Sequence, residues 1–133
     1  MRKRATAIII RNEKLLVFRR HKPGRDYYSL VGGGVELHES FEEACIREVK
    51  EETGLDVTAL QLVRKYLTFE KEECYFLVRV TEGEPVLGGP EVSHQSVDNQ
   101  YIFEWVDSAH FKVINLLPEA SRRMCHEAAP DLF

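Results

Sequence analysis

The amino-acid sequence predicts one α/β (α+β) domain with a mixed β-sheet over residues 1–133. Three observations support this fold class. The length of 133 residues lies within the roughly 100–200 residues of a typical domain. The composition, 44% hydrophobic and 30% charged, is ordinary for a globular protein. Strand-like runs alternate with two helical segments, without repeats or low-complexity tracts, as in domains that layer helices on a sheet.

The first predicted strands lie before residue 35. Residues 5–10 are apolar and β-branched, and residues 15–20 form a second run that the turn Asn12-Glu13 joins into a hairpin. Residues 21–26 contain Pro23-Gly24, so we expect a loop there. A short strand over residues 27–31 then leads into the glycines of residues 32–34.

The second half contributes further strands over residues 57–69, 74–80 and 101–106, the first two separated by the charged turn 70–73. Residues 82–99 form a long loop rich in glycine and proline, and loops of this length inside a compact domain are often functional. Pro118 suits the first turn of a last helix that reaches about residue 128.

Charge and cysteine content narrow the function classes. With 18 Lys and Arg against 22 Asp and Glu, the net charge is −4, whereas domains that bind duplex nucleic acid are usually basic. We therefore expect no duplex nucleic acid as a partner, whereas a small-molecule anion needs only a local pocket. No run approaches the roughly 18–20 apolar residues of a membrane span, so no membrane association is expected. Cys45, Cys74 and Cys125 form no CxxC motif and cannot all pair, which favours reduced thiols and a cytoplasmic location.

Residues 40–53 predict a helix whose ends are both marked. Ser40 is a suitable N-cap, and Glu43 three residues later completes a capping box. Gly54 follows as the residue that ends the helix.

The predicted helix places acidic residues on its apolar side. At about 100° per residue, one arc collects Ala44, Cys45 and Val49. The same arc carries three carboxylates, Glu48, Glu51 and Glu52. Burying three ionised carboxylates together is unfavourable, so either they retain protons or a cation lies among them. Oxygen ligands of this kind suit Mg²⁺ or Mn²⁺. The alternative is a solvent-exposed helix that is simply rich in glutamate.

Residues 33–55 contain a longer motif around this helix. Its positions are Gly33, Glu39, Arg47-Glu48-Val49, Glu51-Glu52 and Gly54-Leu55. This pattern resembles the complete signature of the Nudix hydrolase family, and the chain is most similar to its MutT-like members. His38 departs from the glycine that is common at its position. The resemblance implies an α/β/α sandwich with a mixed β-sheet, and an Mg²⁺-dependent enzyme that cleaves a nucleoside diphosphate linked to another moiety.

The resemblance also implies roles for individual residues. Metal ligands would be Glu48, Glu51, Glu52 and the carbonyl of Gly32. Glu39 and Arg47 would support them, and Arg47 can also be expected to pair with an acid such as Glu39 because opposite charges lie close in the sequence. The general base would be one of the motif glutamates, Glu48 above all, or a glutamate of the long loop.

Glu91 is the loop candidate for this further catalytic carboxylate, with Glu84 and Asp98 as rivals and a solvated loop acid as the alternative. Arg19 and Arg20 alternate in direction along their strand, so one points inward and can bind a substrate phosphate; otherwise both belong to an exposed basic cluster. Asn115 resembles the asparagine with which MutT-like members read a purine, and its alternative role is a helix N-cap. Five aromatic residues stack on a base or belong to the core: Tyr27, Tyr28, Phe76, Tyr101 and Phe103.

The sequence therefore predicts a pyrophosphohydrolase for a nucleoside triphosphate or an oxidised purine nucleotide, which releases a nucleoside monophosphate and a phosphorylated product. Two alternatives stay open: a non-catalytic nucleotide-sensing domain, and an enzyme that acts on RNA 5′ ends. Many members of the family form homodimers, and the sequence leaves the oligomeric state open.

Overall fold

The computed structural model describes residues 1–89 and 91–133 in full and Pro90 as a backbone position only. Its strands are β1 (Arg2–Arg11), β2 (Lys14–Lys22), β3 (Arg25–Ser29), β4 (Val31–Gly34), β5 (Val57–Leu67), β6 (Lys71–Val80) and β7 (Gln100–Val106). Its helices are α1 (Phe41–Thr53), α2 (Pro90–His94), α3 (Ser108–Phe111) and α4 (Glu119–Ala128). Within these described residues, no helix is long and apolar enough to cross a membrane.

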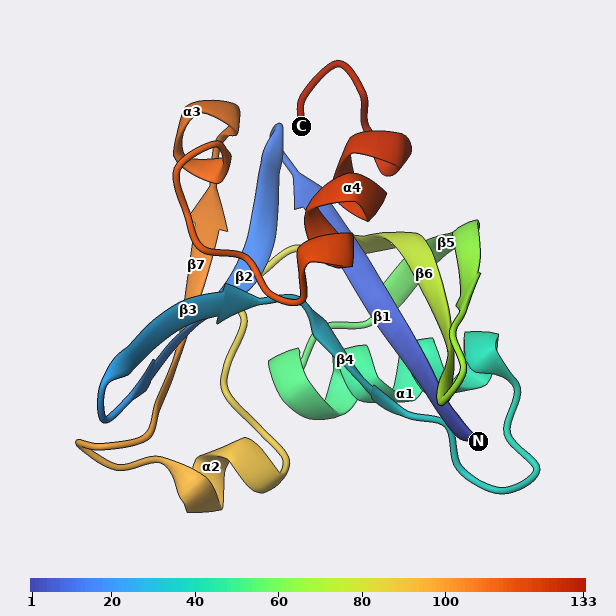
Figure 1. The fold of residues 1–133 in the computed structure, drawn as a ribbon, viewed down its shortest axis with the longest axis horizontal. Helices are drawn as coiled ribbons and strands as arrows, with labels where there is room; N and C mark the ends of the chain where they lie inside the picture. Colours follow the sequence, from blue (N-terminus) through green and yellow to red (C-terminus); the bar gives the residue numbers. More distant parts are fainter.

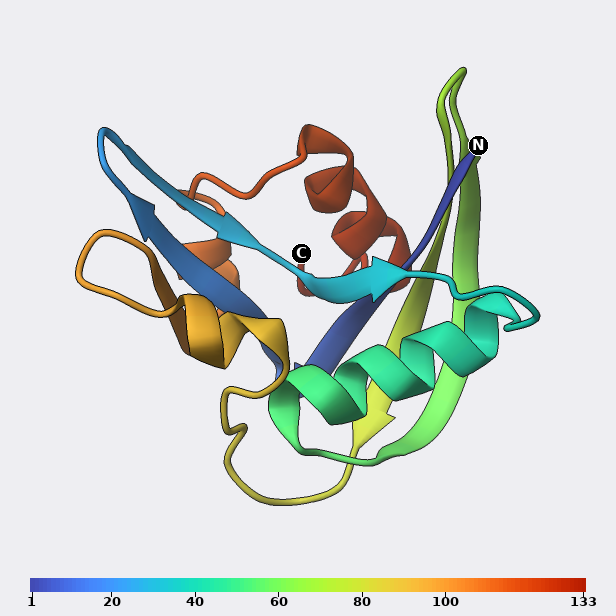
Figure 2. The ribbon, with the colours of Figure 1, turned by 90° about the horizontal axis from the view of Figure 1, so that it is seen from below.

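The strands form a mixed seven-stranded sheet in the order β3-β2-β1-β6-β5, with β4 paired to β1 and β7 paired to β2. The pairing of β1 with β6 is parallel, whereas the other named strand pairs are antiparallel. Helix α1 covers one face of the sheet and α4 the other (Figures 1 and 2). The predicted mixed sheet and three-layer sandwich are confirmed.

Strand β1 lies at the centre because both of its faces are apolar. Ala5, Ala7 and Ile9 belong to the hydrophobic cluster that α1 covers, while Ile8 belongs to the cluster beneath α4. All four side chains are at most 1% exposed. A strand buried on both faces needs such a continuous apolar run.

Two predicted segments are wrong in detail. Residues 21–26 are not a loop, because β2 and β3 continue to a two-residue turn at Pro23-Gly24, where Gly24 adopts a φ of 73°. Proline at the first central position and a glycine of positive φ at the second are typical of a type II turn. The glycines of residues 32–34 belong to β4 and pair with β1.

Further differences concern the second half of the chain. The predicted loop over residues 82–99 contains the short helix α2, and α3 was not predicted. The turn after β5 is shorter than expected because the N–H of Thr68 donates to the carbonyl of Lys71, so β6 begins at Lys71. Pro118 is the N-cap of α4 and lies outside its first turn.

Candidate active site

Helix α1 has the ends that its sequence predicts. The hydroxyl of Ser40 accepts from the N–H of Glu43 at 3.0 Å, and the carboxylate of Glu43 accepts from the N–H of Ser40 at 2.9 Å. Gly54 ends the helix in the left-handed region with a φ of 76°. The apolar face formed by Ala44, Cys45 and Val49 is buried, so the predicted orientation of the helix is confirmed.

Glu52 is the acidic residue most deeply placed on this face. It is only 3% exposed, and its Oε1 accepts from the N–H of Gly32 at 3.1 Å. Burial, followed by the nearby charges of Glu48 and Glu91, raises the pKa of Glu52 to about 9. A buried carboxylate with this pKa is ionised at neutral pH only where a positive charge compensates it.

Glu48 lies against the glycine-containing strand β4. Its side chain is 16% exposed, and a Cβ atom at Gly33 would lie 2.3–2.5 Å from its carboxylate atoms. No side chain fits at such a separation. Gly33 is therefore required for the Glu48 carboxylate to lie where it does against β4.

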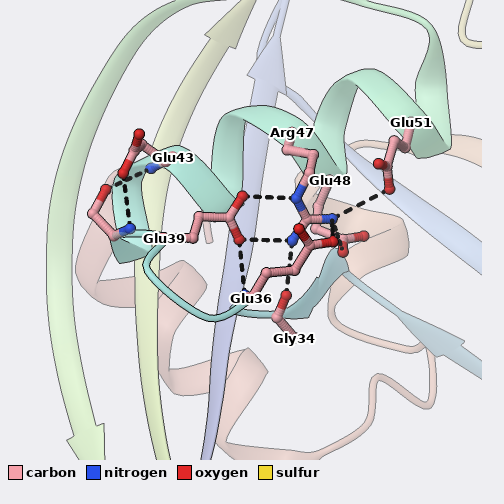
Figure 3. Close-up of polar contacts among 8 residues, drawn as sticks. Gly34, Glu36, Glu39, Glu43, Arg47, Glu48 and Glu51 are labelled. Atoms are coloured by element: carbon pink, nitrogen blue, oxygen red, sulfur yellow. Dashed lines mark hydrogen bonds and ion pairs between the residues drawn. The ribbon is translucent and has the colours of Figure 1, made fainter.

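Arg47 is the centre of a network of acidic side chains (Figure 3). Its Nε and Nη2 donate to the two carboxylate oxygens of Glu39 at 2.7 and 2.9 Å, which is the predicted ion pair. Its Nη1 donates to Glu48 at 2.8 Å and to Glu51 at 3.3 Å, and its Nη2 also donates to the carbonyl of Gly34 at 2.9 Å. The hydrogen bonds from Arg47 lower the pKa of Glu39 to about 2. The network therefore keeps Glu39 ionised and orients Glu48.

His38, which departs from the glycine expected at its position, lies in the loop between β4 and this network. Its φ of 67° falls in the left-handed region that favours glycine. The loop thus keeps a turn that glycine would form with less strain.

Glu51 is more exposed than the wheel predicts. Its side chain is 48% exposed, so it lies at the margin of the inward arc. Among the described residues, no three carboxylate, imidazole or thiol groups are gathered closely enough to hold a metal ion, and Arg47 donates to Glu48 and Glu51 instead. The predicted shared inward position therefore holds for Glu48 and Glu52 but not for Glu51.

The long loop brings one of its three candidate acids to the helix. The N–H of Val86 donates to the carbonyl of Thr53 at 2.9 Å, and that of Gly88 donates to the carbonyl of Glu52 at 3.2 Å. Beyond this junction, the Oε2 atom of Glu91 is buried without a hydrogen-bond partner. The charge of Glu91 contributes to the raised pKa of Glu52.

The rival loop acids, Glu84 and Asp98, are exposed. Glu91 is therefore the one of the three that adds to the carboxylates of the helix. Glu52 and Glu91 fit a hard divalent cation such as Mg²⁺, because Glu52 is a buried carboxylate with a raised pKa and Glu91 has a buried oxygen that lacks a partner.

The three predicted substrate contacts lie in different surroundings. Arg19 is exposed, whereas Arg20 is 6% exposed and donates to groups within the protein. Asn115 is exposed, and its Nδ2 donates to the carbonyl of Asp26 at 3.4 Å. The alternative that Asn115 caps the last helix is wrong, because Pro118 occupies that position.

The aromatic candidates divide in a similar way. Phe76 is 1% exposed and belongs to the core. Tyr101 and Phe103 contact the ring of Phe18, at centroid distances of 6.1 and 4.7 Å. Tyr27 and Tyr28 are half-buried on β3.

A polar pocket near β4 was not predicted. Glu73 is 2% exposed, accepts from the hydroxyl of Thr6 at 2.5 Å, and pairs with Lys71 at 3.1 Å. These residues line a cavity of about 220 Å³ together with Arg2, Arg4, Ser29, Leu30, Leu117, Pro118 and Ser121. Glu73 begins a run of four buried residues, 73–76, in β6. The assignment of residues 70–73 to a turn concealed that Glu73 belongs to this strand.

A comparison with protein families decides the identity of this fold. The family model described as NUDIX domain matches residues 1–124. The chain belongs to the Nudix hydrolase family. The predicted resemblance is thereby confirmed, and members of this family generally use divalent metal ions such as Mg²⁺.

The chain is only moderately similar in sequence to individual Nudix proteins. The chain is 35% identical over 78 residues to an ADP-ribose pyrophosphatase of Methanocaldococcus jannaschii, covering 59% of this chain and only 46% of that relative. It is 25% identical over 146 residues to an RNA pyrophosphohydrolase of Hahella chejuensis, covering 95% of this chain and 89% of that relative.

The fold similarity extends over nearly the whole chain. A structure from work on MutT of Aliivibrio salmonicida and Vibrio cholerae superposes with a TM-score of 0.76, covering 97% of each chain at 23% identity. This similarity shows that the chain has the same Nudix fold.

Proposed function

We propose that this Nudix domain is an Mg²⁺-dependent pyrophosphohydrolase that cleaves a nucleoside diphosphate linked to another moiety. The favoured substrate is a nucleoside triphosphate or an oxidised purine nucleotide, which gives a nucleoside monophosphate and a phosphorylated product. The observation that carries the proposal is Glu52, a buried carboxylate beside two further acids, with its pKa raised to about 9. Such a group is an unfavourable element of a fold unless it serves to bind a cation.

Glu48, Glu51 and Glu52 would hold the cation, with the carbonyl of Gly32 and the carboxylate of Glu91 as further oxygen ligands. When bound, Mg²⁺, or Mn²⁺ in its place, neutralises pyrophosphate charge and makes a bound water more acidic. Both Glu48 and Glu51 accept a hydrogen bond from Nη1 of Arg47, so binding of the cation by these two acids would rearrange their contacts with Arg47.

The proton transfer and the positioning of the reacting groups are carried out by side chains of the protein. Glu48 accepts the proton of the attacking water, because its partly exposed carboxylate is accessible while Glu52 is enclosed. Glu39 fixes the guanidinium of Arg47 from one side, and Arg47 thereby orients Glu48. Attack at phosphorus is in line, so this positioning supplies much of the rate.

The cavity of about 220 Å³ beside β4 supports a nucleoside substrate. Its volume suits a base more than a whole nucleotide, and Thr6 and Glu73 offer hydrogen-bonding groups. Leu117 lines the cavity, and Asn115 lies two residues before it in the chain. Asn115 is therefore our candidate for the residue that reads the base. Arg19 remains the candidate for an exposed phosphate contact.

RNA with a 5′-triphosphate is the second candidate substrate. The specific observation in its favour is the alignment with the Hahella chejuensis RNA pyrophosphohydrolase, which covers nearly the whole of both chains. The net charge of −4 argues against a large contact with RNA.

We also propose that residues 1–133 form a single domain, because β1 contributes to both hydrophobic clusters and so joins the two halves of the sheet. A small nucleotide is then the partner that the domain itself can accommodate.

The test is a panel of nucleotides incubated with and without Mg²⁺, with product identification. The panel contains nucleoside triphosphates, 8-oxo-dGTP, ADP-ribose and 5′-triphosphorylated RNA. We expect Mg²⁺-dependent release of a nucleoside monophosphate from one nucleotide class, and loss of this activity in Glu52→Gln. Tight nucleotide binding without turnover of any substrate would instead identify a sensor.

A further inference from the structure

Arg20 is a buried cation, and each of its three guanidinium nitrogens donates a hydrogen bond within the protein. From β2, its Nε donates to the carbonyl of Gln100 at 3.1 Å, its Nη1 to the hydroxyl of Tyr27 at 3.1 Å, and its Nη2 to Oδ1 of Asn99 at 2.7 Å. Its guanidinium carbon lies 3.5 Å from the ring centroid of Tyr101. Only arginine provides this planar set of donors together with a stacking face.

Asn99 continues the connection from β2 to helix α2. Its Nδ2 donates to the carbonyl of His94, the last residue of α2, at 2.8 Å. Its backbone exchanges hydrogen bonds with Ser96 at 3.0 and 3.2 Å. Gln95 adds a second link, since its Oε1 accepts from the N–H of Tyr101 at 2.7 Å. The C-terminal end of α2 is therefore fixed to the start of β7.

The other end of the same segment is fixed to helix α1. Hydrogen bonds from Val86 to Thr53 and from Gly88 to Glu52 hold the chain just before α2. Glu91 lies between the two attachments, on a helix of only five residues. Such a short helix is not stable by itself, so the place of the Glu91 carboxylate depends on both ends.

We propose that Arg20 is a positioning residue that, through Asn99 and Tyr101, holds helix α2 so that Glu91 faces the acidic side chains of α1. This inference rests on the proposed function, in which Glu91 supplies a carboxylate to the reaction. It differs from the sequence-based prediction that Arg20 binds a substrate phosphate, because the guanidinium is buried and each of its nitrogens already donates to Gln100, Tyr27 or Asn99.

The first part of the test uses Arg20→Lys and Asn99→Ala, with Arg64→Lys as the matched control. Arg64 also forms a two-bond fork, to Glu127 at 2.8 Å, but lies outside the site. Amide hydrogen exchange over residues 91–99 should rise about 10-fold or more in both test variants and stay unchanged in the control. Amide hydrogen exchange needs neither substrate nor metal. If Arg20→Lys does not fold, the same measurement on Asn99→Ala still tests the inference.

The second part measures kcat and KM with Mg²⁺ and the best nucleotide of the panel. In both test variants kcat should fall about 10-fold, with KM within about twofold, because a misplaced carboxylate affects the reaction more than ground-state binding. When Glu91→Gln is already present, adding Arg20→Lys should cause little further loss, since the two residues act through one group.

Three results would overturn the inference. Unchanged exchange over residues 91–99 would show that Arg20 does not hold the segment. A raised KM with unchanged kcat would make Arg20 a substrate ligand. If the losses of kcat from Arg20→Lys and Glu91→Gln multiply in the double variant, the two residues act independently, and Arg20 does not act through Glu91. If the wild-type protein hydrolyses none of the nucleotides, the proposed function fails, while the exchange experiment still decides whether Arg20 holds α2.

Discussion

The backbone of Gly33 and the carboxylate of Glu48 lie so close that no side chain fits between them. A Cβ atom at Gly33 would lie 2.3 Å from Cδ and 2.4 Å from Oε1 of Glu48. The position of Glu48 on α1 is therefore set as much by a missing side chain on β4 as by the helix itself.

Gly33→Ala should displace Glu48 and lower kcat about 100-fold, because a shift of about 1 Å at a reacting group can have an effect of this size. Gly34→Ala is the matched control, since a Cβ there would meet only the carbonyl of Lys3 at 3.9 Å. Steady-state kinetics of both variants check the prediction. Equal kcat values for the two variants would show that the close approach at Gly33 is not needed.

Arg47→Lys should lower both activity and stability. Lysine keeps the charge, but its single nitrogen has three donors and cannot replace the five hydrogen bonds that Arg47 makes from three nitrogens to Glu39, Glu48, Glu51 and the carbonyl of Gly34. We expect kcat to fall about 100-fold and the Tm to fall by about 2–8 °C. Arg64→Lys, which alters an exposed fork to Glu127, should leave kcat unchanged and so excludes a general effect of losing an arginine.

Glu52 predicts how the metal-free protein responds to pH. The unfolded chain releases the proton of a glutamate near pH 4.3, whereas folded Glu52 retains it to about pH 9. Between these values the unfolded state binds fewer protons, so the free energy of unfolding attributable to this group decreases as pH rises. In thermal melts of the metal-free protein from pH 5 to 9, the Tm of the wild-type protein should therefore fall with rising pH relative to that of Glu52→Gln.

Mg²⁺ should change this behaviour, because it compensates the ionised form of Glu52. At pH 8 the cation should raise the Tm of the wild-type protein, since a ligand that binds only the folded state stabilises it. The same cation should leave the Tm of Glu52→Gln almost unchanged. A similar Mg²⁺-induced shift in both proteins would contradict the role of Glu52 as a ligand.

The buried thiols give a prediction for chemical modification. Cys45 and Cys125 are at most 1% exposed, and burial raises the pKa of each thiol to about 12. Thiolates are the reactive form, so a thiol reagent at pH 8 should modify neither residue in the native protein. Mass spectrometry should locate modification at these residues only after unfolding. Rapid native labelling of either cysteine would contradict the packing described for it.

Local patterns in the sequence predicted much of the fold. The apolar run in β1, the capping box at Ser40 and the glycine at residue 54 each depend on neighbours within a few residues. The motif around α1 likewise predicted the Arg47–Glu39 pair and the inward position of Glu52. These predictions hold because the helix period determines which side chains face the sheet.

The remaining features depend on residues far apart in the chain. Arg20 contacts Gln100, which lies 80 positions later, so no local pattern indicates that its donors are occupied. The 48% exposure of the Glu51 side chain depends on what packs beside the helix, and a wheel of one helix contains no such information. The sequence-based assignment of Glu73 to a turn was wrong because the hydrogen bond that marks Glu73 as a buried residue comes from Thr6, 67 positions away in the chain.

The most direct test of the central claim is a titration of the metal-free protein with Mn²⁺, followed by the electron paramagnetic resonance signal of the free ion. The account predicts saturable binding by the wild-type protein, at least about 10-fold weaker binding by Glu52→Gln, and unchanged binding by Glu127→Gln, an acidic residue in an ion pair outside the site. Equal Mn²⁺ affinity in all three proteins would show that the carboxylates of α1 do not hold the cation.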